Sequence, residues 1–246
     1  MWLALDTSCL TLSLALVRPG GDVVEHVLVP PPTKQSEVLP QLIGEVLARN
    51  GLGLRDVKGL VTGLGPGSFT GLRIGIACLK GLSYALKVPL VGVSSLKALA
   101  LEGPHDTELW CASVVKKNEL YLGRYRNVGE AAFALEPETS LPLDTFAAAL
   151  ARTPDARMVG PALVDYREAL LERGVAPAQL ADGPLVPSAV ALARLASWPA
   201  AYDAQAVFAL EPHYLRGSGA EENPKFPPLP GVESKARLLP TSVKDS

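Results

Sequence analysis

The sequence predicts an α/β fold of two lobes, in which one order of strands and helices occurs twice. Residues 1–104 have the predicted order βββαβαβα, and similar elements recur in a similar order after residue 105. With 246 residues, 48% of them hydrophobic, the chain can build one large core or two smaller ones. No repeated sequence accompanies the repeated element order, so the order alone indicates an internal duplication.

Three strands and a helix open the first lobe. Residues 2–5 are apolar and end at Asp6, residues 11–17 alternate between small or polar and larger apolar residues, and residues 23–29 follow a Pro-Gly-Gly-Asp turn. A helix begins at Ser36 or Pro40 and ends at Arg49, because its apolar residues recur at helical spacing and Gly51 follows as a terminator.

The remaining elements alternate between strands and helices. In the first lobe, a strand at 58–62 leads through a glycine-rich loop at 63–67 into a helix at 68–86, a strand at 89–93 and a helix at 94–101. The second lobe has strands at 109–115, 120–126 and 131–135, a helix opened by Asp144, a strand at 157–160, and helices at 162–173 and 188–198. Five prolines and mixed charges in 217–246 predict a tail with little fixed structure.

Composition excludes several classes of protein. The formal net charge is −2, divided as +2 over residues 1–104, −4 over 105–216 and 0 over 217–246, so no basic arm is present to bind nucleic acid. The longest uncharged stretch, 59–72, is too short and too rich in glycine to span a membrane. Three dispersed cysteines are typical of reduced thiols. We therefore expect a cytoplasmic protein.

The most distinctive motif runs from Gly63 to Gly75, at a predicted junction between a strand and a helix. A helix N-terminus can bind an anion or a nucleotide, and the candidate contacts are Asp6, Gly65, Gly67, Ser68 and Thr70. The spacing matches neither a Walker A loop nor a dinucleotide fingerprint. A tight turn with close packing is the alternative explanation of the glycines.

Small residues gather on one face of the helix that follows. Gly71, Gly75, Cys78 and Leu82 have the spacing i, i+4, i+7, i+11, which places them on a single face. Glycine within a helix costs about 1 kcal/mol relative to alanine, so its repetition indicates that another helix approaches closely. Spacing alone leaves open whether that helix belongs to this chain or to a partner.

The sequence contains no recognisable catalytic or metal-binding constellation. His26, His105 and His213 are far apart, and none has the cysteine or histidine neighbours of a zinc site. No nucleophile elbow surrounds any serine.

Several segments nevertheless resemble the TsaB family, also called YeaZ. They are the opening Leu-Ala-Leu-Asp6-Thr-Ser, the block from Gly63 to Gly75, the stretches Lys80-Gly-Leu and Pro89-Leu-Val-Gly-Val-Ser94-Ser-Leu, and Glu211-Pro-His-Tyr-Leu-Arg216. The resemblance covers most of residues 1–216. It implies the two-lobed, duplicated fold of the acetate kinase, sugar kinase, Hsp70 and actin superfamily.

The resemblance also implies a non-catalytic role. Compared with the related catalytic subunit TsaD, the acidic pair of the first turn is replaced by Leu10 and Thr11, and the metal-binding histidines by Ser94, Ser95 and Leu99. The chain departs from many TsaB proteins at Val114 and Lys116, where an Asp-x-Arg occurs, and in its longer tail.

The function implied by the resemblance is that of a non-catalytic subunit of the tRNA N6-adenosine threonylcarbamoyltransferase complex. It would bind TsaD through its N-terminal lobe, at 1–104, and support transfer of a threonylcarbamoyl group to the adenosine next to the anticodon. In the family, TsaE joins the complex, homodimers form without TsaD through a similar surface, and tRNA would be bound mainly through the complex. ATP and the metal would lie on partner subunits, with no cofactor in this chain.

This resemblance favours an intermolecular role for the face that contains Gly71, Gly75, Cys78 and Leu82. The alternative is an active ATPase or small-molecule kinase of the same superfamily. That enzyme would use Asp6 and the loop from Gly65 to Thr70 to bind ATP.

Overall fold

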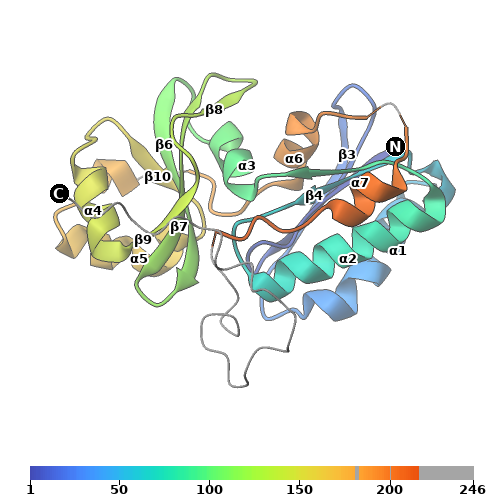
Figure 1. The fold of residues 1–246 in the computed structure, drawn as a ribbon, viewed down its shortest axis with the longest axis horizontal. Helices are drawn as coiled ribbons and strands as arrows, with labels where there is room; N and C mark the ends of the chain where they lie inside the picture. Colours follow the sequence, from blue (N-terminus) through green and yellow to red (C-terminus); the bar gives the residue numbers. More distant parts are fainter. Residues whose placement is uncertain (181–182, 200, 216–246) are drawn as a thin grey trace, which may run out of the picture. The chain divides into compact units, whose positions relative to one another are not determined.

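The computed structural model describes residues 1–180, 183–199 and 201–215 (Figure 1). It divides into one unit at Met1–His213 and a second at Tyr214–Ser246, and all the elements below belong to the first unit. The proline-rich stretch 217–246, for which we predict little fixed structure, lies outside the described residues.

The first lobe contains a mixed five-stranded sheet with the order β3-β2-β1-β4-β5. Its strands are β1 (Trp2–Asp6), β2 (Leu12–Val17), β3 (Val23–Val29), β4 (Gly59–Gly63) and β5 (Leu90–Val93). β1, β2 and β3 pair antiparallel, whereas β4 and β5 run parallel to β1. Parallel pairs need crossover connections, and the helices between β3, β4 and β5 supply them. The predicted strands of this lobe are confirmed.

Helices cover both faces of this sheet. They are α1 (Gln35–Arg49), α2 (Phe69–Leu86), α3 (Ser95–Glu102), α6 (Ala189–Leu195) and α7 (Ala204–Ala209). Successive residues of a strand point to opposite faces, so Leu3 and Leu5 of β1 pack in the core with α1 and α2. Ala4 packs in the other core, with α3 and α6. Because both faces are buried, β1 reads in sequence as a continuous apolar run.

The second lobe contains another five-stranded sheet. Its strands are β6 (Thr107–Lys116), β7 (Glu119–Asn127), β8 (Ala132–Ala134), β9 (Thr139–Pro142) and β10 (Arg157–Val159). The order is β10-β6-β7-β8, and β9 pairs with β7 beyond the end of β8. Helices α4 (Leu143–Ala151) and α5 (Ala162–Glu172) share a core with this sheet. Short 3-10 turns lie at Leu54–Asp56 and Pro177–Leu180.

The two sheets have corresponding orders, as a duplicated fold requires. Antiparallel β6, β7 and β8 correspond to β1, β2 and β3, and β10 lies parallel to β6 as β4 lies parallel to β1. Within the described residues, no strand of the second sheet corresponds to β5. The predicted two-lobed α/β fold is confirmed.

One helix contacts both sheets. In Figure 1, α3 lies between the first sheet and strands β6 and β7. Leu96 and Leu99 of α3 belong to the same buried cluster as Leu109 and Tyr125 of the second sheet. A shared apolar core joins the two lobes at this point.

The chain returns to the first lobe after the second sheet. The helix predicted at 188–198 is shorter, ending at Leu195, and it packs against β1, β2 and β4. Ser13 of β2 anchors it, because the Ser13 hydroxyl accepts a hydrogen bond from the Ala189 amide at 2.8 Å. The sequence boundary at residue 105 therefore separates the two sheets but not all of their helices.

Candidate functional site

The carboxylate of Asp6, at the end of β1, is bonded within the chain. Its Oδ1 accepts hydrogen bonds from the Ser8 amide at 2.8 Å and the Ser8 hydroxyl at 2.6 Å. Its Oδ2 accepts one from the Ser95 hydroxyl at 2.6 Å. The side chain is completely buried, and burial raises the pKa of Asp6, although these hydrogen bonds oppose the rise. Three hydrogen-bond donors of this chain therefore already bind the carboxylate that we predicted from the sequence as a ligand contact.

The glycine-rich loop packs directly on this first turn. A Cβ at Gly63 would overlap the Asp6 carboxylate, and one at Gly67 would overlap the main chain of Ser8. The Ser68 amide donates to the Ser8 carbonyl oxygen at 2.7 Å. The glycines therefore permit close approach of two backbone segments, which is the packing alternative that the sequence left open.

The start of α2 is capped by its own residues. The Ser68 hydroxyl accepts a hydrogen bond from the Gly71 amide at 3.1 Å, and Thr70 is exposed. Gly65 has φ +83° and its amide donates to the Ser95 hydroxyl at 3.1 Å. Anion binding by Asp6, Gly65, Gly67, Ser68 and Thr70 stays a prediction, and most of these groups have internal partners.

Two of the four predicted interface residues on α2 are buried inside the lobe. A Cβ at Gly71 would overlap the Thr7 carbonyl oxygen, and one at Gly75 would overlap the Thr7 hydroxyl. Cys78 and Leu82 are half-buried and pack at the edge of the core beneath α1 and α2. A partner interface at these four residues stays a prediction, but a partner would have to reach α2 from another side, since Gly71 and Gly75 already lie against Thr7.

The outward side of α2 also carries small residues. Ala77 and Gly81 are exposed, and a Cβ built at Gly81 would meet nothing within 4 Å. Tyr84, one turn further, is 52% exposed. No contact within the described residues requires a glycine at position 81. The outward side of α2 therefore carries small residues too, in addition to the side where Gly71 and Gly75 face Thr7.

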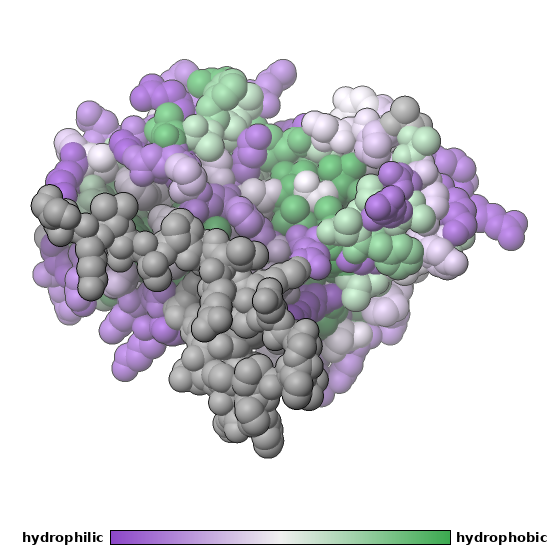
Figure 2. Space-filling view, in the orientation of Figure 1, coloured by the Kyte–Doolittle hydropathy of each residue, from purple (hydrophilic) through white to green (hydrophobic). Residues whose placement is uncertain are grey.

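Helix α7 lies beside this outward side. Lys80 Nζ donates to the Phe208 carbonyl oxygen at 2.9 Å, and the rings of Tyr84 and Phe208 have centroids 5.8 Å apart. Phe208 is 57% exposed. Figure 2 shows pale to strong green, hydrophobic surface over the region of α2 and α7. The two helices together form an exposed surface that contains two aromatic rings.

A buried carboxylate that sequence reasoning did not select lies between the lobes. Glu138, in the segment between β8 and β9, has a side chain only 7% exposed. Its Oε1 accepts hydrogen bonds from the hydroxyls of Ser94 and Tyr125, and His213 Nδ1 lies 3.0 Å from its Oε2. The cluster also raises the pKa of Tyr125, first through burial and then through the charge of Glu138. The residues of this cluster are far apart in the sequence, so no local sequence motif predicts it.

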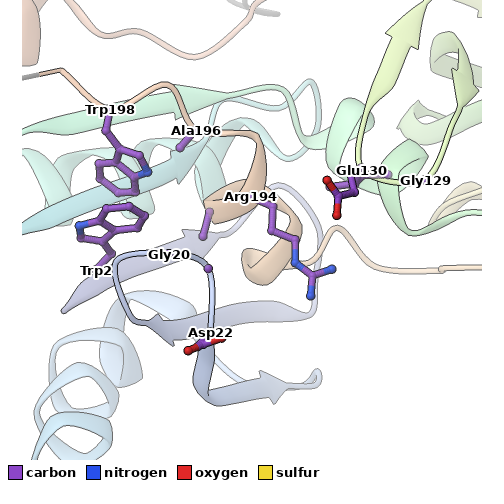
Figure 3. A pocket seen from close by; sticks show the side chains of 11 residues that line it. Trp2, Gly20, Asp22, Gly129, Glu130, Arg194, Ala196 and Trp198 are labelled. Atoms are coloured by element: carbon purple, nitrogen blue, oxygen red, sulfur yellow. The ribbon is translucent and has the colours of Figure 1, made fainter.

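A cavity of about 610 Å³ shares no lining residue with the glycine-rich turn (Figure 3). The stacked rings of Trp2 and Trp198, with centroids 4.0 Å apart, form one wall. Figure 3 shows Arg194 extending from α6 between the tryptophan pair and Glu130. Residues of both lobes line the cavity, and Trp2 and Trp198 are 196 residues apart in the sequence, so its formation depends on the tertiary fold.

The described residues contain neither a cluster of metal ligands nor a helix that could span a membrane. Among these, no three histidine, cysteine, aspartate or glutamate side chains lie close enough to hold a metal ion. None of the helices in the same residues combines the length and the apolar character needed to cross a membrane.

Comparison with known proteins identifies the family. The family model described as TsaD, tRNA N6-adenosine threonylcarbamoyltransferase, matches residues 29–155, slightly more than half of the chain. Proteins named tRNA threonylcarbamoyladenosine biosynthesis protein TsaB from Haemophilus influenzae and Escherichia coli are 38% and 39% identical to it over 125 and 127 residues. The chain belongs to this family, and these relatives within it are named TsaB. Each match covers 50% of the chain and 52% or 54% of the relative, so the chain spans about half the length of these TsaB proteins.

Solved structures described as YeaZ or similar to YEAZ resemble this chain over most of its length. A Pseudomonas aeruginosa protein described as similar to peptidase YEAZ superposes with a TM-score of 0.66 at 26% identity, covering 87% of this chain and 99% of that chain. YeaZ from the same organism has a TM-score of 0.61 at 26% identity, covering 79% and 89%. These likenesses confirm the YeaZ resemblance and the fold class that it implied.

Proposed function

We propose that the chain is a non-catalytic subunit of a tRNA N6-adenosine threonylcarbamoyltransferase complex, in which it binds TsaD and supports modification of the adenosine next to the anticodon. Similarity to TsaB proteins supports the pathway, because these relatives are named for threonylcarbamoyladenosine biosynthesis. The internal bonding of the Asp6 turn supports the non-catalytic role, since its polar groups already have partners within the chain.

The residues that stand at the metal-binding positions of TsaD have structural roles here. The Ser94 hydroxyl caps α3, accepting from the Lys97 amide at 3.1 Å, and Ser95 binds Asp6. Leu99 is buried in the core between the lobes. This use of the three positions favours a chain that leaves the metal and the transfer step to TsaD.

The outward side of α2 is the surface that we assign to TsaD. Ala77 and Gly81 would let a partner helix approach closely, and Tyr84 and Phe208 would add aromatic contact area at its edge. The half-buried Cys78 and Leu82 flank this side, whereas Gly71 and Gly75 would support it from within. The same surface would serve a homodimer when TsaD is absent.

The test is complex formation between the purified chain and its cognate TsaD, with matched substitutions on two helices. Ala77→Arg places a long charged side chain on the outward side of α2, whereas Ala148→Arg makes the same change on the exposed side of α4. We expect Ala77→Arg to weaken binding at least tenfold and Ala148→Arg to leave it within twofold. Absence of binding by the wild-type chain would overturn the function, and equal binding by both variants would overturn the surface.

The same preparation tests the remaining partners. TsaE should join the complex when ATP is present, and tRNA should bind the complex more tightly than the chain alone. Neutralising Lys80, Lys87 and Lys97 tests for a direct tRNA contact, although Lys80 and Lys87 already contact Phe208 and Tyr84 in the structure. Loss of most of the tRNA affinity in that variant would show that this chain contributes more than we propose.

An ATPase or small-molecule kinase of the same superfamily is the competing function. It would require the loop from Gly65 to Thr70 to open around a nucleotide, with Asp6 released from Ser8 and Ser95. Calorimetry on the isolated chain distinguishes the two functions, because the kinase predicts ATP binding without TsaD and our proposal predicts none.

A further inference from the structure

The segment 201–213, here called the strap, crosses the outer part of the first lobe and carries α7. Val207 is its one buried residue within α7, and it packs in the core with α1 and α2. Two polar and aromatic contacts also join α7 to α2, namely the Lys80 bond to the Phe208 carbonyl oxygen and the tilted ring pair of Tyr84 and Phe208. A six-residue helix with so few buried contacts depends on its flanking segments to stay in place.

The strap is held at its far end by His213. The His213 amide donates to the Leu64 carbonyl oxygen at 2.8 Å, at the start of the glycine-rich loop. The His213 ring lies 3.0 Å from Glu138 Oε2, within ion-pair distance, and no described group donates a hydrogen bond to that oxygen. The imidazole is therefore the natural partner of the second carboxylate oxygen.

Glu138 is itself fixed in orientation by both lobes. Ser94 lies between β5 and α3, and Tyr125 lies in β7 of the second sheet, and their hydroxyls donate to the same carboxylate oxygen. Burying a carboxylate oxygen without a hydrogen-bond donor lowers the stability of the fold, and the Glu138 side chain is only 7% exposed. The nearby His213 ring offsets part of this loss of stability. Glu138 thus presents one oriented oxygen to the strap.

We propose that Glu138 is a positioning residue, which holds the strap through His213 and thereby keeps α7 against α2. Release of His213 would free the segment that follows α7 and would let Phe208 move away from Tyr84. The consequence for partner binding rests on the proposed function, because the surface formed by α2 and α7 is the one assigned to TsaD. The predicted effect of Glu138 on the position of the strap does not depend on that function.

Hydrogen exchange of α7 tests the proposal in the full chain. We expect Glu138→Gln to raise the exchange rates of the α7 amides at least fivefold, while amides in the centre of α2 and in α4 change less than twofold. Glu136→Gln is the matched control, because Glu136 lies two residues away, is exposed and pairs with Arg124. It should leave α7 unchanged. Unchanged α7 exchange in Glu138→Gln would overturn the proposal.

A second variant separates this specific contact from a general loss of stability. His213→Gln removes the imidazole without altering the buried carboxylate, and it should raise α7 exchange to the same extent as Glu138→Gln. The double variant should add nothing further, since both changes break one contact. Additive effects, or exchange that rises equally in α4 and α7, would show that Glu138 acts on the fold as a whole and would overturn the proposal.

Binding to TsaD gives the functional readout. If the strap shapes the proposed surface, Glu138→Gln and His213→Gln should each weaken TsaD binding at least threefold, and Glu136→Gln should not. Wild-type protein that fails to bind TsaD would contradict the proposed function and leave the exchange result to decide the role of Glu138. Faster α7 exchange with unchanged TsaD affinity would overturn the link between the strap and the partner surface.

Discussion

Alanine substituted for glycine along α2 should change stability in opposite directions at different positions. Gly81 lies on the outward side of the helix, where a Cβ would meet nothing within 4 Å. At Gly75 a Cβ would overlap the Thr7 hydroxyl, and at Gly71 it would overlap the Thr7 carbonyl oxygen. The same substitution therefore places a new methyl group in open space at Gly81, against a side chain at Gly75 and against the main chain at Gly71.

The magnitudes follow from two opposing contributions. Alanine is favoured over glycine in a helix interior by about 1 kcal/mol, so Gly81→Ala should raise the free energy of unfolding by about that amount. Overpacking costs about 1–3 kcal/mol, so Gly75→Ala should lower the free energy of unfolding by roughly 0–2 kcal/mol, because the Thr7 side chain can shift. Gly71→Ala should lower it by about 2 kcal/mol or more, since the Thr7 carbonyl cannot move without its backbone.

Urea denaturation followed by far-ultraviolet circular dichroism measures these differences. Repeating Gly75→Ala in a Thr7→Ala background removes the overlapping hydroxyl, and there the substitution should become stabilising by up to about 1 kcal/mol. Equal gains at Gly75 and Gly81 in the wild-type background would refute the packing of α2 on the first turn.

Two further predictions concern ionisable groups. Burial raises the pKa of Asp6 above 3.8, so the folded state binds this proton more tightly than the unfolded state, and the associated stability is lost as pH rises through the folded-state pKa. The free energy of unfolding of the wild type should therefore fall relative to that of Asp6→Asn as pH increases above about 4, and urea midpoints with parallel pH profiles would contradict this. Burial also raises the pKa of Cys9 to about 12, so at pH 8 its alkylation should be about a hundredfold slower than that of an unfolded cysteine. Peptide mass spectrometry after timed iodoacetamide labelling measures that rate, and equal rates for folded and unfolded protein would contradict the burial.

Most helices and strands could be predicted because the residues that start, end and orient each of them lie close together in the sequence. The capping serine and following apolar spacing place α2 within one residue of its observed start, and Gly51 correctly marks the end of α1. Besides the two 3-10 turns, one short strand and one short α-helix escaped prediction. β9 is a four-residue strand that pairs with β7, and α7 has six residues and one buried side chain, so neither repeats its pattern long enough to be detected.

The sequence determined the family and the glycine positions, but it could not determine what each glycine faces. Spacing placed Gly71 and Gly75 on one side of a helix, and only the fold shows that Thr7 occupies that side.

The same limit applies to Glu138 and His213, which are 75 residues apart in the printed sequence. Helical and strand periodicities report which residues of one element share a face. Which other element covers that face depends on how the lobes pack, and here the return of α6 and of the strap to the first lobe decided it.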